Sequence, residues 1–165
     1  MTTDCSRLSP RMWKLLQRFS ALDKGAQRLF LCATVLIPMI SASLRLRGLR
    51  ATQATLERFL LTCAHTRDQA KGNMAKDAAR IAHMVHAAAR YGLARPTCLE
   101  SSLALWWFLG RRGIESSLRI GTRKTAGGLE AHAWVEFGGN SLDETGGALP
   151  DYAPFDALFP VVSRR

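Results

Sequence analysis

The chain has 165 residues, of which 47% are hydrophobic and 22% are charged. These proportions are typical of a globular protein and exclude a disordered chain, and the length favours one domain over two. The net charge of +10 is uneven, because residues 1–96 hold 16 basic and 5 acidic residues (+11), whereas residues 97–165 hold 7 and 8 (−1). The basic half predicts either a surface for an acidic partner (a peptide, a protein or a nucleic acid) or a solvated helical face.

The cysteines and the apolar stretches indicate the redox environment of the protein and whether it spans a membrane. Four cysteines are scattered without CxxC spacing or a neighbouring histidine cluster: Cys5, Cys32, Cys63 and Cys98. This argues against a disulfide framework and a zinc site, and it predicts a reducing, cytoplasmic environment. The longest apolar stretch, residues 29–40, falls short of the roughly 20 residues that span a membrane. We therefore expect a buried helix there, with an interfacial helix as the alternative, and no membrane span.

Residues 1–92 are expected to form a basic, helical region. A first helix should begin at Ser9-Pro10, where a capping residue precedes a proline at the first helical position. A second should begin near Ser20 or Asp23 and kink or stop near Pro38. A third helical segment should open at Thr52 or Thr55.

A fourth helix is indicated by apolar residues at helical spacing from Met74 to Ala89, and it should end at Gly92. His83 and His86 lie three residues apart on this helix, as two metal ligands would. No third ligand is near in the sequence, so we interpret them as its polar flank and expect no bound metal.

The segment from Arg95 to Gly113 organises the rest of the chain. Thr97 followed by Glu100 is a capping-box signature, so a helix should begin at Thr97 and hold Cys98 in its first turn. A thiol at that position lies at the positive end of the helix dipole, which favours the thiolate. Gly113 supplies the left-handed residue that ends the helix.

After this helix the pattern changes to strands. Residues 116–122 predict a strand, residues 123–128 a loop, residues 131–137 a second strand, and Gly138-Gly139-Asn140 a turn into a short strand at 141–143. The tail at 151–155 is expected to be irregular and to fold back on the core. Helices followed by antiparallel strands indicate an α+β fold.

The last hairpin makes a geometric prediction. If Gly138-Gly139 are the loop residues, Asp143 lies opposite Trp134 and on the same face as His132, within side-chain reach. A loop at Gly139-Asn140 would place Asp143 opposite Glu136 instead, farther from His132.

A cysteine at a helix start, a histidine on a strand and an aspartate on the next strand are the parts of a nucleophile, a base and an orienting group. We predict these roles for Cys98, His132 and Asp143. Each residue alone could be structural: a buried thiol, a strand histidine or a turn aspartate. Trp134 is expected either to wall the site or to pack in the core.

Four motifs carry a family resemblance: Cys98-Leu99-x-x-Ser102-Leu103-Ala104-Leu105, Arg111-Arg112-Gly113-Ile114, Ile120-Gly121-x-Arg123 and Ala131-His132-Ala133-Trp134-Val135-Glu136. With them the chain resembles the transglutaminase-like leader peptidases of lasso-peptide biosynthesis, closely over residues 95–145 and more loosely before. Glu100 departs from the basic or small residue expected after the cysteine. The resemblance implies a helical region at 1–92 and a papain/transglutaminase-like core at 93–165, which we expect to form one compact unit.

The resemblance also implies a cysteine protease without a cofactor that removes the leader from a ribosomally made precursor peptide. A macrolactam synthetase then closes the ring on the freed amine, and a small recognition protein grips the leader. Because the chain begins directly with the helical region, we expect that recognition protein to be separate. The candidate surface for it or for the leader is a group of basic residues: Arg45, Arg47, Arg50 and Arg58.

Two other functions remain open. A transglutaminase or acyltransferase would use the same three residues but pass the acyl group to an amine instead of water. A non-catalytic binder of acidic partners is the second alternative. No aromatic-basic RNA motif and no zinc finger occur in the sequence, so we predict no nucleic-acid partner.

Overall fold

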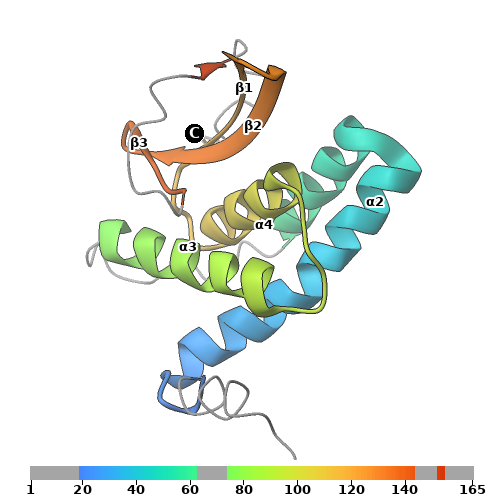
Figure 1. The fold of residues 1–165 in the computed structure, drawn as a ribbon. Helices are drawn as coiled ribbons and strands as arrows, with labels where there is room; N and C mark the ends of the chain where they lie inside the picture. The colour runs from blue at the N-terminus through green and yellow to red at the C-terminus, as the bar shows by residue number, and fades with distance from the viewer. Residues whose placement is uncertain (1–18, 63–73, 144–151, 155–165) are drawn as a thin grey trace, which may run out of the picture.

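The computed structural model describes residues 19–62, 74–143 and 152–154. Within them, three helices precede a small antiparallel sheet (Figure 1). The helices are α2 (Lys24–Thr62), α3 (Met74–Tyr91) and α4 (Cys98–Arg111), and the strands are β1 (Ser117–Thr125), β2 (Gly128–Phe137), β3 (Asn140–Ser141) and β4 (Ala153–Pro154). The strand order is β3-β2-β1-β4, and the predicted α+β class is confirmed. The predicted helix start at Ser9-Pro10 lies outside the described residues.

Helix α4 lies at the centre of the molecule, between the sheet and the other two helices (Figure 1). The largest fully buried apolar side chains come from α2, α3, α4, β1 and β2: Ile37, Ile40, Val85, Leu103, Leu105, Leu109, Leu118 and Val135. These side chains belong to one continuous hydrophobic cluster. The helix that carries Cys98 is therefore held on both sides by packed apolar surface, which fixes its position relative to the sheet.

Helix α2 breaks at a different residue from the one predicted. Pro38 lies inside the helix, and the only non-helical backbone angles are those of Gly48 (φ 74°, ψ 177°). A proline removes one backbone hydrogen bond, but Ile37 and Ile40 on either side of it are buried in the core. Packing therefore keeps this part helical. The helix breaks at Gly48 instead, because glycine adopts a positive φ at a lower cost in free energy than other residues do.

The expected helix start at Thr52 or Thr55 is also wrong, because helix already follows Gly48. The Thr52 hydroxyl donates to the carbonyl of Gly48, and the Thr55 hydroxyl donates to that of Ala51, each four residues earlier and at 2.8 Å. This is the bond that threonine makes inside a helix, not the bond of a capping residue. The start at Asp23 is confirmed, since its carboxylate accepts from the backbone N–H of Gly25 and Ala26.

The apolar stretch of α2 is buried on one side only. Among the described residues, Lys24–Leu60 is the one segment long and apolar enough to cross a membrane by length and composition, two criteria that soluble core helices also meet. Ala33, Ile37 and Ile40 face the core, but only 17% of the most apolar window is buried. Its exposed apolar side chains recur once per turn: Leu31, Val35 and Met39.

Helix α3 agrees with the prediction. It ends at Tyr91, and its buried residues keep the predicted spacing: Ala78, Ile81, Ala82, Met84, Val85 and Ala88. Gly92 follows, with its N–H donating to the carbonyl of Ala88 at 2.8 Å.

The first hairpin of the sheet is longer than predicted. Residues 123–125 belong to β1 instead of a loop, and the turn into β2 consists of Ala126-Gly127. Arg123 lies opposite Glu130 in the register and donates to its carboxylate at 3.0 Å, so a charged pair extends the strands. The tail folds back as expected, because Ala153–Pro154 pairs with β1 as the edge strand β4.

Candidate active site

The capping box at the start of α4 places Cys98 as predicted. The Thr97 hydroxyl accepts from the backbone N–H of Glu100 at 3.4 Å, and the Glu100 carboxylate accepts from the N–H of Thr97 at 2.7 Å. Glu100 is only 8% exposed and does not line the pocket described below. Its side chain therefore serves the helix start, which leaves Cys98 as the first helical residue with its side chain free to face the sheet.

Gly113 ends this helix with a φ of 69°. The N–H of Ile114 donates to the carbonyl of Leu109, and the N–H of Gly113 donates to that of Gly110, both at 3.0 Å. These are the two bonds of a Schellman motif. Both ends of α4 are thus defined by its own sequence.

The β2–β3 hairpin brings His132 and Asp143 together. Gly138 and Gly139 both have positive φ (57° and 80°), as a two-residue type I′ turn requires. Glu136 pairs with Ser141, so Asp143 lies opposite Trp134. The Asp143 carboxylate Oδ2 lies 2.7 Å from His132 Nε2, which confirms the predicted register and places the imidazole N–H on the carboxylate.

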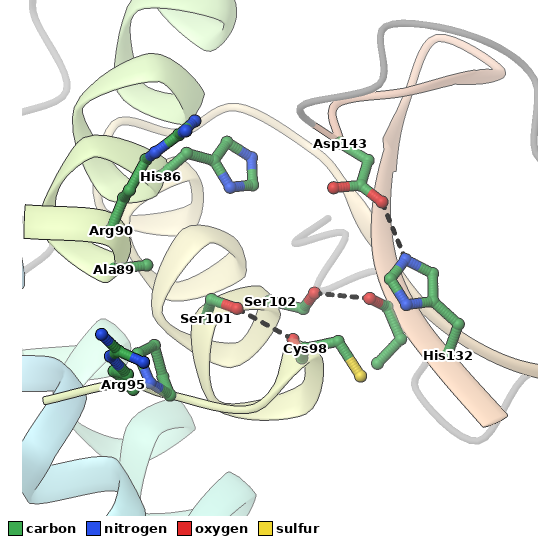
Figure 2. A pocket seen from close by; sticks show the side chains of 11 residues that line it. His86, Ala89, Arg90, Arg95, Cys98, Ser101, Ser102, His132 and Asp143 are labelled. Atoms are coloured by element: carbon green, nitrogen blue, oxygen red, sulfur yellow. Dashed lines mark hydrogen bonds and ion pairs between the residues drawn. The ribbon is translucent and has the colours of Figure 1, made fainter. Parts of the chain in front are cut away.

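Cys98, His132 and Asp143 line one open pocket of about 300 Å³ (Figure 2). In Figure 2 the Cys98 side chain projects from the start of α4 toward the strand that carries His132, and the second ring nitrogen of His132 lies on the side of the imidazole nearer to the sulfur. In the described part of the chain no hydrogen bond joins the thiol to the imidazole. Such contacts are often long in a free enzyme and shorten when substrate binds.

Two side chains to which the sequence assigned no role in the site hold its parts together. The Ser102 hydroxyl, 8% exposed, donates to the carbonyl of Ala133 at 2.9 Å and so ties the helix of Cys98 to the strand of His132. His86 on α3 contacts the carbonyl of Leu142, next to Asp143, through Nε2 at 3.0 Å. The predicted polar flank of α3 therefore includes a contact to the segment that carries the carboxylate.

Aromatic rings surround the other sides of His132. The Trp134 ring lies nearly parallel to the imidazole with centroids 6.2 Å apart, and the Tyr152 ring lies 5.3 Å from it. Trp134 is 5% exposed and does not line the pocket, so it packs behind His132 instead of walling the cavity. Gly121 makes this stack possible, because a Cβ there would lie 2.9 Å from Trp134 and 2.8 Å from the Ala153 carbonyl oxygen.

A charged cluster anchors Tyr152 beside His132. The Tyr152 hydroxyl donates to Glu130 at 3.0 Å, and the guanidinium of Arg123 lies 4.7 Å from the Tyr152 ring centroid. The pKa of Glu130 is lowered, mainly by the hydrogen bond from Arg123 and next by that from Tyr152. The pKa of Tyr152 is raised, mainly by burial and next by its hydrogen bond to Glu130. Both shifts favour the ionised carboxylate and the neutral phenol that this contact requires.

The predicted basic surface does not reach this pocket. Its four members are exposed on α2, and none of them is among the lining residues: Arg45, Arg47, Arg50 and Arg58. Two other arginines of the basic half, Arg90 and Arg95, line the pocket instead. Of the remaining cysteines, Cys32 is exposed on α2, whereas Cys5 and Cys63 lie outside the described residues. No group of His, Cys, Asp or Glu suited to a metal ion occurs in the described ranges.

The site has the elements of covalent acyl chemistry. A thiol lies at a helix N-terminus, where backbone N–H groups without helical partners can stabilise an oxyanion. An imidazole held by a carboxylate lines the same pocket, and this combination suits a cysteine nucleophile with a general base. This arrangement can support attack of a thiolate on an acyl carbon.

The family comparison agrees. Residues 41–156 match the model of the transglutaminase-like superfamily, so the chain belongs to that superfamily. Its members are typically cysteine proteases or acyltransferases. No curated protein and no solved structure gives a significant match to the chain.

Proposed function

We propose that this protein is a cysteine peptidase that removes the leader from a lasso-peptide precursor. The observation that carries the proposal is the pocket that brings Cys98, at the start of α4, together with an imidazole fixed by Asp143. The lasso-peptide assignment rests on the motifs around Cys98 and His132, which resemble those of the leader peptidases in that pathway. The superfamily of the chain supplies the chemistry of the class.

The proposed reaction follows from the positions of these groups. The Cys98 thiolate attacks the scissile carbonyl carbon, and backbone N–H groups of the first turn of α4 stabilise the resulting oxyanion. His132 donates a proton to the departing amine, which becomes the new N-terminus of the core peptide, and a thioester to the leader remains. His132 then takes a proton from water, the hydroxide attacks the thioester, and the leader leaves with a free carboxylate.

Asp143 has a positioning role in this scheme. Its carboxylate accepts the Nε2–H of His132, so the other ring nitrogen is the one available to the thiol and the leaving group. The carboxylate also stabilises the imidazolium that forms during attack. Ser102 holds α4 to β2 through its bond to Ala133, and His86 holds the Asp143 segment to α3 through its contact with Leu142.

The proposed partners are the precursor peptide, a separate leader-recognition protein and a macrolactam synthetase that uses the freed amine. The exposed α2 arginines Arg45, Arg47 and Arg50 flank the break at Gly48 and are the proposed contact for the leader or the recognition protein. Charge reversal of these three residues should weaken binding in a salt-dependent manner. Unchanged binding and cleavage would remove this surface from the proposal.

The first experiment combines the protein with a lasso-peptide precursor and a leader-recognition protein and follows the products by mass. Wild type should release leader and core, and Cys98→Ala should not. Cys32→Ala, which removes an exposed cysteine that does not line the pocket, should cleave normally. Cleavage by Cys98→Ala would refute the nucleophile. A product heavier by an added amine would indicate the acyltransferase alternative, and tight binding without any product would indicate a binder.

A further inference from the structure

We propose that Arg90 and Arg95 form a carboxylate-binding subsite in the catalytic pocket, so that the enzyme selects an aspartate or glutamate next to the scissile bond. The inference deepens the proposed function, because it names the substrate feature that the same pocket would recognise. Both arginines line the cavity together with Cys98. They are exposed, so their guanidinium groups are accessible to a ligand.

The charge balance within the pocket carries the argument. Among the described residues, Asp143 is the one acidic residue that lines the pocket, and it is bound to His132. Neither Arg90 nor Arg95 forms an ion pair or hydrogen bond in the described ranges, and Arg90 only lies over the Tyr91 ring, 5.8 Å from its centroid. Such a ring contact does not neutralise a guanidinium. The cavity beside the thiol therefore holds two uncompensated positive charges.

The arginines outside the pocket provide a comparison. Three of them have acidic partners on a neighbouring element: Arg80 with Asp23, Arg119 with Glu136 and Arg123 with Glu130. Arg45, Arg47 and Arg50 lie on the exposed surface of α2, where solvent screens them, and they do not line this pocket. Arg90 and Arg95 differ from that group because they face a cavity that contains a nucleophile, and a partly enclosed site concentrates their field.

Their positions suit recognition of a side chain. Figure 2 shows Arg90 and Arg95 on the side of the pocket opposite His132 and Asp143, with the start of α4 between the two sides. Pro96 restricts the backbone of Arg95 to extended conformations, which limits where its side chain can begin. A peptide whose scissile carbonyl lies at Cys98 can thus direct one neighbouring side chain toward the two guanidinium groups. Arginine binds a carboxylate through two parallel N–H donors, so Asp and Glu fit this subsite.

A reagent test examines the subsite without any peptide substrate. Iodoacetate and iodoacetamide both alkylate a thiolate: the S–C bond forms, the C–I bond breaks and iodide leaves. They differ in that only iodoacetate carries a carboxylate. The measured quantity is the ratio of the two rate constants at Cys98, followed by peptide mass mapping so that the other cysteines do not contribute.

We expect Arg90→Gln and Arg95→Gln each to lower the iodoacetate-to-iodoacetamide ratio by about 3-fold, and the double variant by about 10-fold. The matched control is Arg112→Gln, an exposed arginine at the opposite end of α4, which should leave the ratio unchanged. Any attraction of iodoacetate by a protonated His132 is the same in all these proteins. Equal ratios in wild type and the double variant would overturn the subsite.

A peptide test then examines selectivity. Peptides that span the cleavage junction, with Glu or Gln at each of three positions on either side, should show one position where wild type prefers Glu in kcat/KM. The double variant should lose that preference, and Arg95→Glu should favour Lys at the same position. If wild type cleaves none of the peptides while the reagent ratios change as expected, the peptidase proposal fails and the anion subsite stands. Cleavage with no acidic preference at any position would overturn the proposed selectivity alone.

Discussion

Removing the carboxylate of Asp143 is the most direct test of how the site is built. The bond from His132 Nε2 to Asp143 Oδ2 is 2.7 Å long, the length of a charge-assisted hydrogen bond once the imidazolium forms. Bonds of this kind contribute about 1.5–3 kcal/mol, compared with about 0.5–1.5 kcal/mol for neutral ones. Asp143→Asn keeps an acceptor without the charge and should lower kcat/KM about 10-fold, whereas Asp143→Ala should lower it about 100-fold.

The assay is precursor cleavage under kcat/KM conditions, with thermal unfolding of each variant measured in parallel. Glu115→Gln, which neutralises an exposed acidic residue that does not line the pocket, serves as the control for the loss of one negative charge. The iodoacetamide rate at Cys98 should fall in the same order, because the carboxylate stabilises the imidazolium that accompanies the thiolate. An Asp143→Ala enzyme with wild-type kcat/KM and wild-type thermal stability would refute this account of the pair.

Three further predictions concern the scaffold. Thr97→Ala removes the cap of α4 and should lower the free energy of unfolding by about 1 kcal/mol in urea titrations. An unchanged free energy of unfolding would mean that the cap is dispensable. Gly121→Ala should cost about 1–3 kcal/mol and change Trp134 fluorescence, since the new methyl group overlaps that ring; a neutral result would contradict the close packing. The hydrogen bond from Arg123 lowers the pKa of Glu130, so its stabilisation is present above the unfolded-state pKa and lost as pH falls through the lower folded-state value. The stability advantage of wild type over Glu130→Gln should therefore shrink between about pH 6 and about pH 3, and a constant difference would contradict this.

The parts of the site that could be predicted depend on short-range patterns. Thr97 and Glu100 are three residues apart, and their mutual hydrogen bonds are a property of the helix start itself. His132 and Asp143 are eleven residues apart, but a two-residue turn fixes which residues of the two strands lie opposite each other. Counting residues from the turn therefore predicts that the two side chains meet. In both cases the local backbone geometry determines the contact, and the packing of the remaining chain has little effect on it.

The break in α2 shows where such reasoning fails. Pro38 is the stronger breaker by intrinsic propensity, yet the helix continues through it and deviates at Gly48. The difference comes from burial: Ile37 and Ile40, on either side of Pro38, pack in the core, whereas Gly48 is exposed and has no such restraint. Propensity acts on a scale of a few kcal/mol, and packing of a buried helix face can exceed it.

The remaining features of the site arise from contacts between distant segments. His86 reaches the carbonyl of Leu142 across 56 residues, Ser102 reaches that of Ala133 across 31, and Tyr152 reaches Glu130 across 22. No periodicity or spacing encodes these pairs, because they depend on how α3, α4 and the edge strand pack around one core. Cysteine, histidine and aspartate could be named from local pattern. Arg90 and Arg95 are close to Cys98 in the sequence, but their place in the pocket could not be predicted, because the direction of their side chains depends on how α3 packs against α4.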